Sequence, residues 1–322
     1  MALLEVTGLT TEFRTGRGVV RAVDSVSFQV HAGETLAVVG ESGSGKSVTA
    51  LSIMRLVPSP PGRIAGGSIR FADQELLALS EPAMRAVRGN RIAMIFQEPM
   101  SALNPSIQIG RQIAEPLTMH RGFSWPRALE MAKTLLGRAR VPDAASRIES
   151  WPHQFSGGMR QRAMIAMALA CEPKLLIADE PTTALDVTVQ AQILDLLKDI
   201  TRESGSALLL ITHNLGIVAR YADRIAVMYG GRLIETGSAR DIFEHPAHPY
   251  TEGLLASVPR LDSTAKSHLF AIDGQPPDLA HLPPGCAFAP RCGKRIAACQ
   301  TTRPVLTTVG ANHQAACLLH AA

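Results

Sequence analysis

A glycine-rich turn at residues 40–47 contains the residue types that bind phosphate. Its sequence, GESGSGKS, matches the phosphate-loop pattern at Gly40, Gly45, Lys46 and Ser47. Glycines let backbone N–H groups converge on phosphate oxygens, and the N-terminus of a following helix adds positive charge. Lys46 would neutralise the β- and γ-phosphates of ATP, while the Ser47 hydroxyl would coordinate Mg²⁺. The residues predicted to contact the nucleotide here are Gly40, Ser42, Gly43, Ser44, Gly45, Lys46, Ser47 and Val48.

A second group of candidate residues follows an apolar stretch near the middle of the chain. Residues 175–180 read LLIADE, a predicted strand that ends in Asp179 and Glu180. The C-terminal ends of such strands meet at the edge of an open α/β sheet where ligands bind. Asp179 would help to hold Mg²⁺, and Glu180 would polarise a water for attack on the γ-phosphate. Alone, such a strand end is more typical of a solvated surface, so its meaning depends on the phosphate loop.

The elements around these residues alternate between short apolar strands and helices. A strand over 35–39 and a helix over 46–57 flank the phosphate loop, which distinguishes it from an ordinary surface turn. Further strands are predicted over 92–96, 175–178, 207–211 and 225–228, and helices over 188–203 and 214–221. This alternation indicates a parallel sheet covered on both faces.

Three other regions have a different pattern. The first thirty residues alternate apolar and polar types, which predicts short antiparallel strands. Residues 98–172 have helical spacing, with predicted helices over 109–120, 126–139 and 157–171. Past Gly237 the regularity fades.

A motif within this helical region indicates the family to which the chain is similar. Residues 155–162, FSGGMRQR, resemble the signature sequence of ATP-binding cassette (ABC) ATPases. The wider sequence is similar to the ATPase subunits of oligopeptide and dipeptide importers over nearly the whole chain, as in IFQEPMSALNP and HPAHPYTEGLL. The resemblance implies an α/β fold: a P-loop NTPase (RecA-like) core with an antiparallel β subdomain, a helical signature subdomain and a small Cys-rich C-terminal extension. The implied boundaries are 1–237 for the nucleotide-binding domain, about 98–172 for its helical subdomain and 238–322 for the extension.

The resemblance also implies roles for residues outside the phosphate loop. Gln97 would be the Q-loop residue and a Mg²⁺ ligand, and Glu180 the catalytic glutamate. Asp186 ends a D-loop that reads Thr183-Ala184-Leu185-Asp186. His213, in ITHN, would be the switch histidine that bonds the γ-phosphate. The catalytic set implied in this way is Lys46, Gln97, Glu180 and His213.

Two further nucleotide contacts are implied. Phe13 would stack on adenine, although a half-buried strand phenylalanine is a competing interpretation. The signature residues Ser156, Gly157 and Gly158 would contact the γ-phosphate held by the loop of a second cassette, in a head-to-tail pair around two ATP molecules. These residues open a predicted helix, so they supply N–H donors suited to an anion.

Composition limits the class of protein. The chain has 322 residues, 46% of them hydrophobic, which excludes wholesale disorder, and a net charge of +4, too small for a dedicated nucleic-acid binder. No stretch approaches the roughly 20 apolar residues of a membrane helix. The N-terminus lacks the features of a secretory signal, so we expect a cytoplasmic protein.

The excess charge lies in a cysteine-rich C-terminal segment. Beyond the last acidic residue, Asp278, stand four basic residues: Arg291, Lys294, Arg295 and Arg303. The cysteine segment, residues 286–317, contains Cys286, Cys292, Cys299 and Cys317. The spacing of these cysteines is compatible with a zinc site, a disulfide or a [4Fe–4S] cluster. A disulfide is disfavoured because the cytoplasm keeps thiols reduced. The resemblance to importer subunits favours the cluster, with the cations placed among its thiolates. Cys171 is predicted to be a core residue.

The function implied by the resemblance is that of the ATPase subunit of a di- or oligopeptide importer, peripheral on the cytoplasmic face of the membrane. Its expected partners are a homologous second ABC ATPase subunit in a heterodimer, two transmembrane permease subunits and an extracytoplasmic peptide-binding protein. Related cassettes serve nickel, other small solutes and antimicrobial peptides, which stay open as substrates. An ABC ATPase acting on nucleic acid or ribosomes is disfavoured, because the chain has neither a second cassette nor a strong basic patch.

Overall fold

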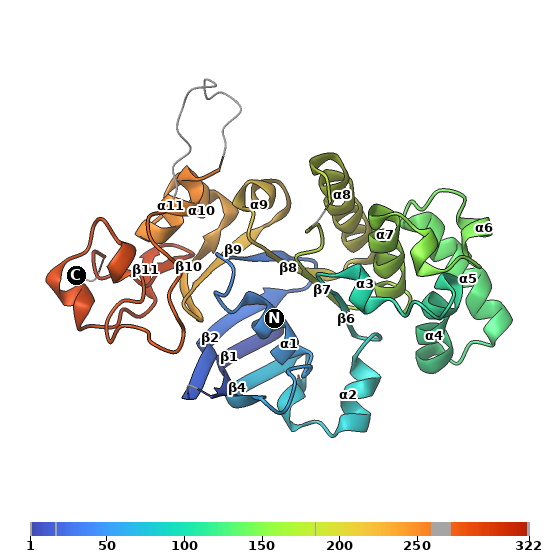
Figure 1. Cartoon of the computed structure of the whole chain (residues 1–322), viewed down its shortest axis with the longest axis horizontal. Helices are drawn as coiled ribbons and strands as arrows, with labels where there is room; N and C mark the ends of the chain where they lie inside the picture. The colour runs from blue at the N-terminus through green and yellow to red at the C-terminus, as the bar shows by residue number, and fades with distance from the viewer. Residues whose placement is uncertain (1, 17, 184, 259–271, 321–322) are drawn as a thin grey trace. The chain divides into compact units, whose positions relative to one another are not determined.

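The computed structural model describes residues 2–16, 18–183, 185–258 and 272–320. These residues form two compact units. The helical unit consists of His31–Glu34 and Ala78–Leu210. The sheet unit consists of Ala2–Val30, Thr35–Leu77 and the described part of Ile211–Ala322 (Figure 1).

The N-terminal strands of the sheet unit form an antiparallel sheet with the order β2-β1-β4-β5. Their bounds are β1 (Ala2–Thr15), β2 (Gly18–His31), β4 (Gly62–Phe71) and β5 (Gln74–Glu75). In β2, buried Val26, Phe28 and Val30 alternate with exposed Ser27 and Gln29, as expected for a strand with one buried face. Strands therefore form where the alternating pattern predicts them, but β1 and β2 each have 14 residues and are not the short strands expected.

A second, mixed set of strands in the sheet unit has the order β11-β12-β10-β9-β3. The buried strand β3 (Thr35–Val39) runs parallel to β9 (Arg224–Tyr229), which pairs antiparallel with β10 (Arg232–Ser238). Strands β11 (Thr307–Gly310) and β12 (His313–Ala315) form an antiparallel pair, and β12 adds to the free edge of β10. The C-terminal region therefore extends this sheet, which the fading sequence pattern did not predict.

The helices of this unit are short. They are α1 (Lys46–Ile53), α9 (Leu215–Tyr221), α10 (Ala239–Glu244) and α11 (Pro249–Ala256), with single 3₁₀ turns at Leu76–Ala78, Ala289–Arg291 and Ala297–Gln300. The helix predicted over 46–57 ends at Ile53, because the backbone turns into the left-handed region at Arg55, with φ 52°.

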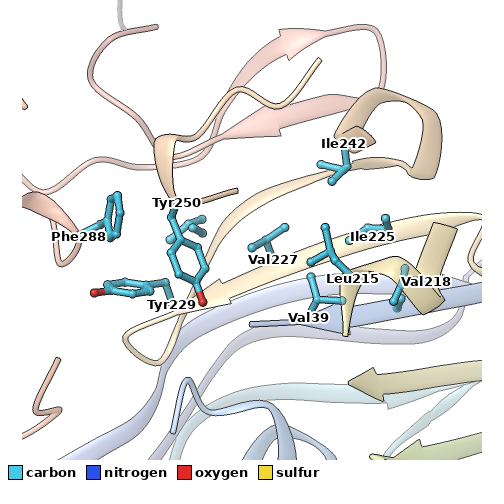
Figure 2. Packing of buried hydrophobic residues seen from close by; sticks show 11 residues of the cluster. Val39, Leu215, Val218, Ile225, Val227, Tyr229, Ile242, Tyr250 and Phe288 are labelled. Carbon is cyan, nitrogen blue, oxygen red and sulfur yellow. The ribbon is translucent and has the colours of Figure 1, made fainter. Parts of the chain in front are cut away.

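The core of the sheet unit joins distant parts of the sequence. Figure 2 shows side chains from β3, β9, α9, α10 and α11 packing together with Phe288 of the cysteine segment. The rings of Tyr229 and Tyr250 have centroids 4.5 Å apart, and Phe288 lies edge-on to Tyr229 at 5.2 Å. Burying such a ring contributes about 1.5–3 kcal/mol. The cysteine segment is thus anchored in this core.

The strands of the helical unit follow the order β8-β7-β6. Strand β6 (Ile92–Ile95) runs parallel to β7 (Leu175–Asp179), next to β8 (Ala207–Thr212), whose residues up to Leu210 belong to this unit. The helices are α2 (Glu81–Val87), α3 (Pro99–Ala102), α4 (Ile109–Arg121), α5 (Trp125–Arg138), α6 (Ala144–Arg147), α7 (Gly157–Ala168) and α8 (Val187–Ser204), with a 3₁₀ turn at Pro152–Gln154.

Helices α4, α5 and α7 pack against one another, in the green part of the ribbon in Figure 1. On α4, buried Ile109, Ile113 and Leu117 recur every four residues, so the helix presents one apolar stripe. The predicted helices in 98–172 are confirmed, although the one over 157–171 ends three residues earlier, at Ala168. None of the described helices has the length and apolar character needed to span a bilayer.

Candidate active site

The phosphate loop connects β3 to α1 in the sheet unit. Its glycines are required by close backbone approaches. A Cβ atom at Gly40 would collide with the carbonyl oxygen of Met228, and one at Gly45 would collide with that of Ala22. Gly45 also has φ 102°, a conformation that favours glycine, where the loop enters the helix. The loop therefore has the strand–turn–helix context that its sequence predicts.

The polar side chains of the loop differ in exposure. Lys46 is buried, and its Nζ donates to the carbonyl oxygens of Gly40 at 2.7 Å and Glu41 at 2.9 Å. The buried Ser44 Oγ has no hydrogen-bond partner within the described part of the chain. Ser47 and Val48 are partly buried, whereas Ser42 and Gly43 are exposed. A folded-back lysine and an unpartnered hydroxyl are groups that phosphate oxygens can satisfy.

Glu41 links the phosphate loop to distant residues of the sheet unit. Its backbone N–H donates to the hydroxyl of Tyr250 at 2.8 Å. Its carboxylate accepts two hydrogen bonds from the Arg291 guanidinium, at 2.7 and 3.0 Å. The hydrogen bonds to Glu41 raise the pKa of Arg291 above its ordinary value. The Glu41–Arg291 pair could not be predicted from the sequence, because no local pattern connects residues 250 positions apart.

Two other predicted residues lie in the sheet unit. Phe13 is partly buried on β1, opposite Gly62 of β4. His213 is exposed and directly follows β8, while the next residue, Asn214, donates its backbone N–H to Thr212 Oγ1 at 3.1 Å. The roles of Phe13 and His213 stay predictions.

The predicted catalytic carboxylate lies in the helical unit. Asp179 is the buried last residue of β7, and Glu180 follows it with φ 45°. Glu180 Oε2 accepts hydrogen bonds from Gln97 Nε2 at 3.1 Å and from Thr183 Oγ1 at 2.9 Å. The structure therefore brings Gln97 and Glu180 together at the ends of the parallel strands β6 and β7. Thr183 was predicted only as part of the D-loop motif, and its spacing of three from Glu180 is the signal that could have indicated this contact.

The signature and the D-loop lie side by side in the helical unit. Ser156 caps α7, with its hydroxyl accepting from the backbone N–H of Met159 at 3.3 Å, and Asp186 caps α8 in the same way through Val189 at 2.9 Å. A Cβ on Gly158 would lie 3.1 Å from Val189. Ser156, Gly157 and Asp186 are exposed, and Gly158 is partly buried. Ala184 of the D-loop motif lies outside the described residues.

The five cysteines are free thiols. Cys171 is fully buried, and its Sγ donates to the Pro116 carbonyl oxygen at 3.4 Å, so the predicted core position is confirmed. In the cysteine segment, Cys299 and Cys317 are buried and Cys286 and Cys292 partly buried. Burial raises the pKa of the Cys286, Cys292 and Cys317 thiols, and the negative charge that Cys299 would carry as a thiolate raises each further. In the part of the chain that the structure describes, no three or more His, Cys, Asp or Glu side chains are arranged to hold a metal ion.

The cations of the C-terminal segment have carboxylate partners on other elements. Arg291 pairs with Glu41, as described above. Lys294 Nζ lies 2.6 Å from a carboxylate oxygen of Glu252 on α11, and Arg303 Nη2 lies 2.6 Å from Asp24 Oδ2 on β2. These three ion pairs attach the segment to the rest of the sheet unit. The charge of Lys294 also lowers the pKa of the Cys292 thiol, against the larger effect of burial, which raises it. The expected placement of cations among the thiolates therefore stays a prediction.

A solved structure places this arrangement in a known class. The ATP-binding cassette MJ0796, solved as a dimer in a post-hydrolysis state bound to ADP and phosphate, is 26% identical and superposes with a TM-score of 0.66. The match covers 74% of this chain and 99% of that chain. The protein therefore has the α/β fold of an ABC ATPase cassette, with mixed sheets.

Sequence comparisons agree with the fold. A family model described as ABC transporter matches residues 23–183, and one described as Oligopeptide/dipeptide transporter, C-terminal region, matches residues 234–299. The dipeptide transport ATP-binding protein DppD of Bacillus subtilis is 51% identical, over 98% of this chain and 94% of its own length. The oligopeptide transport ATP-binding protein OppD of the same organism is 54% identical, over 90% of this chain and 81% of its own length. The chain belongs to the ABC transporter family.

Proposed function

We propose that the chain is the ATP-hydrolysing subunit of an ABC importer for di- and oligopeptides. The observation that carries the proposal is the combination of a buried phosphate-loop lysine on β3–α1 with a Gln97–Glu180 pair at the end of β7. The family match and the two peptide-transport relatives support the substrate class. Residues 1–237 would form the nucleotide-binding domain, with a helical subdomain at about 98–172, and 238–322 the extension.

In this proposal the chain's residues divide the work of ATP hydrolysis. The backbone of the phosphate loop and Lys46 hold the triphosphate, with the Lys46 ammonium moving from the loop carbonyls to phosphate oxygens. Ser47, Gln97 and Asp179 would supply oxygen ligands of the type that Mg²⁺ prefers, and Mg²⁺ held there would offset negative charge on the phosphates. Phe13 would stack on the adenine.

Glu180 would act as the general base. Its Oε2 is held by Gln97 and Thr183, so the carboxylate has a fixed orientation. It would orient a water molecule and accept its proton as the oxygen attacks the γ-phosphorus, and the bond to the ADP oxygen breaks. His213 would donate a hydrogen bond to the γ-phosphate during this step.

We also propose partners for the exposed motifs. Exposed Ser156, Gly157 and Asp186, with partly buried Gly158, would face the phosphates of a second, homologous cassette in a heterodimer. The dimeric state of MJ0796 supports this pairing. The helical subdomain would contact two permease subunits, which places the chain on the cytoplasmic face of the membrane. An extracytoplasmic peptide-binding protein would act through these permeases.

The test is the variant Glu180→Gln in the assembled transporter. We expect it to bind MgATP with near-normal affinity and to hydrolyse it at least about 100-fold more slowly, because the amide cannot accept the proton of the attacking water. Glu244→Gln, on the exposed surface of α10 and outside the helical subdomain, is the matched control and should hydrolyse ATP normally. Unchanged turnover of Glu180→Gln would contradict the role of Glu180.

Substrate class needs a separate measurement. Uptake of a labelled dipeptide should depend on ATP and should be competed by unlabelled di- and oligopeptides. Uptake of nickel instead, with no response to peptides, would replace the peptide assignment while leaving the ATPase assignment intact.

We further propose that the cysteine segment binds a [4Fe–4S] cluster through Cys286, Cys292, Cys299 and Cys317. The soft thiolate donors suit such a cluster. The backbone N–H of Cys286 donates to the carbonyl oxygen of Cys299 at 2.9 Å, which brings two of the four cysteines together. No catalytic step depends on it. Protein purified without oxygen should contain iron and acid-labile sulfide in equal amounts, whereas stoichiometric zinc would favour the zinc alternative.

A further inference from the structure

Glu41 occupies a position of the phosphate loop where the phosphate-binding pattern sets no requirement for a side chain. In this chain all of its hydrogen-bonding groups are engaged. Its carbonyl oxygen accepts from Lys46 Nζ at 2.9 Å and from the Ser44 N–H at 3.2 Å, both inside the loop. Its N–H and its carboxylate bond to Tyr250 and Arg291, both outside the loop. Glu41 is therefore the residue at which the loop is attached to the C-terminal part of the sheet unit.

Arg291 has an acceptor for each of its five guanidinium N–H groups. Two go to the Glu41 carboxylate and one to the Tyr229 hydroxyl at 3.4 Å. The remaining two go to the carbonyl oxygens of Asp273 at 2.9 Å and Ile272 at 3.2 Å. The side chain is only 6% exposed. A buried guanidinium that is fully paired in a planar fork has one preferred orientation.

The backbone that carries Arg291 is also fixed. Arg291 is the last residue of the 3₁₀ turn Ala289–Arg291, which directly follows Phe288. Phe288 is buried against Tyr229 and Tyr250, and Tyr250 is the acceptor of the Glu41 N–H. The support of the loop is therefore built into the packed core shown in Figure 2.

We propose that Arg291 is a positioning residue for ATP binding: its two-pronged pair with Glu41 holds the phosphate loop in the conformation that accepts the triphosphate. This inference rests on the proposed function. Without the pair, the loop keeps the Glu41 carbonyl contacts to Lys46 and Ser44 but loses its side-chain attachment to the core. ATP would then have to order the loop on binding, which lowers the affinity.

The experiment measures MgATP affinity and loop protection in the full chain. Arg291→Ala should raise the Kd for MgATP about tenfold and speed amide hydrogen exchange in peptides that cover residues 40–47. Arg291→Lys keeps the charge but not the fork, so it should weaken binding nearly as much. Lys294→Ala is the matched control, because it removes a cation three residues away that pairs with Glu252 on α11, and it should change neither readout.

Glu41→Gln separates positioning from charge neutralisation. Under our proposal it weakens MgATP binding, and Glu41→Gln combined with Arg291→Ala binds no more weakly than Arg291→Ala alone. Tighter binding by Glu41→Gln than by wild type would overturn the positioning role. If Arg291→Ala fails to fold, the MgATP affinities of Arg291→Lys and Glu41→Gln still test the positioning role.

The two proposals can fail separately. Failure of the wild-type chain to bind MgATP would overturn the proposed function. Normal binding by the wild type, with unchanged binding by these variants, would overturn only the positioning role of Arg291.

Discussion

The phosphate loop and the cysteine segment both contain residues suited to chemistry, but they acquire their structure in different ways. The loop has a local sequence motif and is flanked directly by β3 and α1, although the backbone atoms that leave room only for its glycines belong to Met228 and Ala22. The cysteine segment is held by partners far away in the sequence: Phe288 in the aromatic core, Arg291 on Glu41 and His313 on Glu235. A local motif can therefore depend for its geometry on a region that has no motif of its own.

The largest effect is expected when Phe288, the anchor of the cysteine segment in the core, is removed. Phe288→Ala deletes a ring that is 3% exposed in the core of the sheet unit, which should lower the free energy of unfolding by about 3–5 kcal/mol. Chemical denaturation measures the change. Ile296→Ala, in the same segment but 43% exposed, should cost less than about 0.5 kcal/mol. Equal effects of the two substitutions would show that the segment is only an appendage.

The comparison also explains what the sequence could predict. Strands β3, β7 and β9 and helices α4, α5 and α8 were predicted within about two residues, because short apolar runs and helical spacing are local signals. Gln97 and Glu180 were each predicted as site residues, but the hydrogen bond between them is a finding of the structure.

The rest depended on contacts that no local pattern encodes. Strand β12 forms by pairing with the edge of β10. The same contact buries the Glu235 carboxylate of β10, which accepts a hydrogen bond from the ring of His313 on β12 at 2.7 Å. The carboxylate partners of Arg291 and Lys294 were not predicted for a similar reason. Glu41 and Glu252 lie 250 and 42 positions away from them in the sequence.

The second prediction concerns the phosphate loop itself. Lys46→Ala removes the buried ammonium that would pair with the β- and γ-phosphates, so MgATP binding should weaken about 100-fold. Isothermal titration calorimetry measures the affinity. Lys133→Ala, which removes a surface ion pair with Glu130 on α5, is the control and should bind normally. Normal affinity and normal hydrolysis by Lys46→Ala would argue against a phosphate loop at residues 40–47.

The smallest effect is expected at the ion pairs of Asp24, which also attach the cysteine segment and which depend on pH. Asp24 Oδ2 accepts from Arg232 Nη2 and from Arg303 Nη2, each at 2.6 Å. Burial alone would raise the pKa of Asp24, but the hydrogen bonds and charges of the two arginines hold it below its ordinary value of 3.8. Because Arg303 is 43% exposed, solvent screens its share, and Arg303→Ala should lower the free energy of unfolding at pH 7 by only about 0.5–1 kcal/mol.

The sign of the pH dependence follows from that depressed pKa. A carboxylate whose pKa is lower in the folded state stabilises the fold above its unfolded pKa, and this contribution is lost as the pH falls through the folded value. The difference in unfolding free energy between wild type and Arg303→Ala should therefore be constant near neutral pH and shrink below about pH 3.8. Arg295→Ala, which removes an exposed cation of the cysteine segment, should show no such change. A difference that persists unchanged in acid would mean that Arg303 stabilises the segment through packing of its stem and not through Asp24.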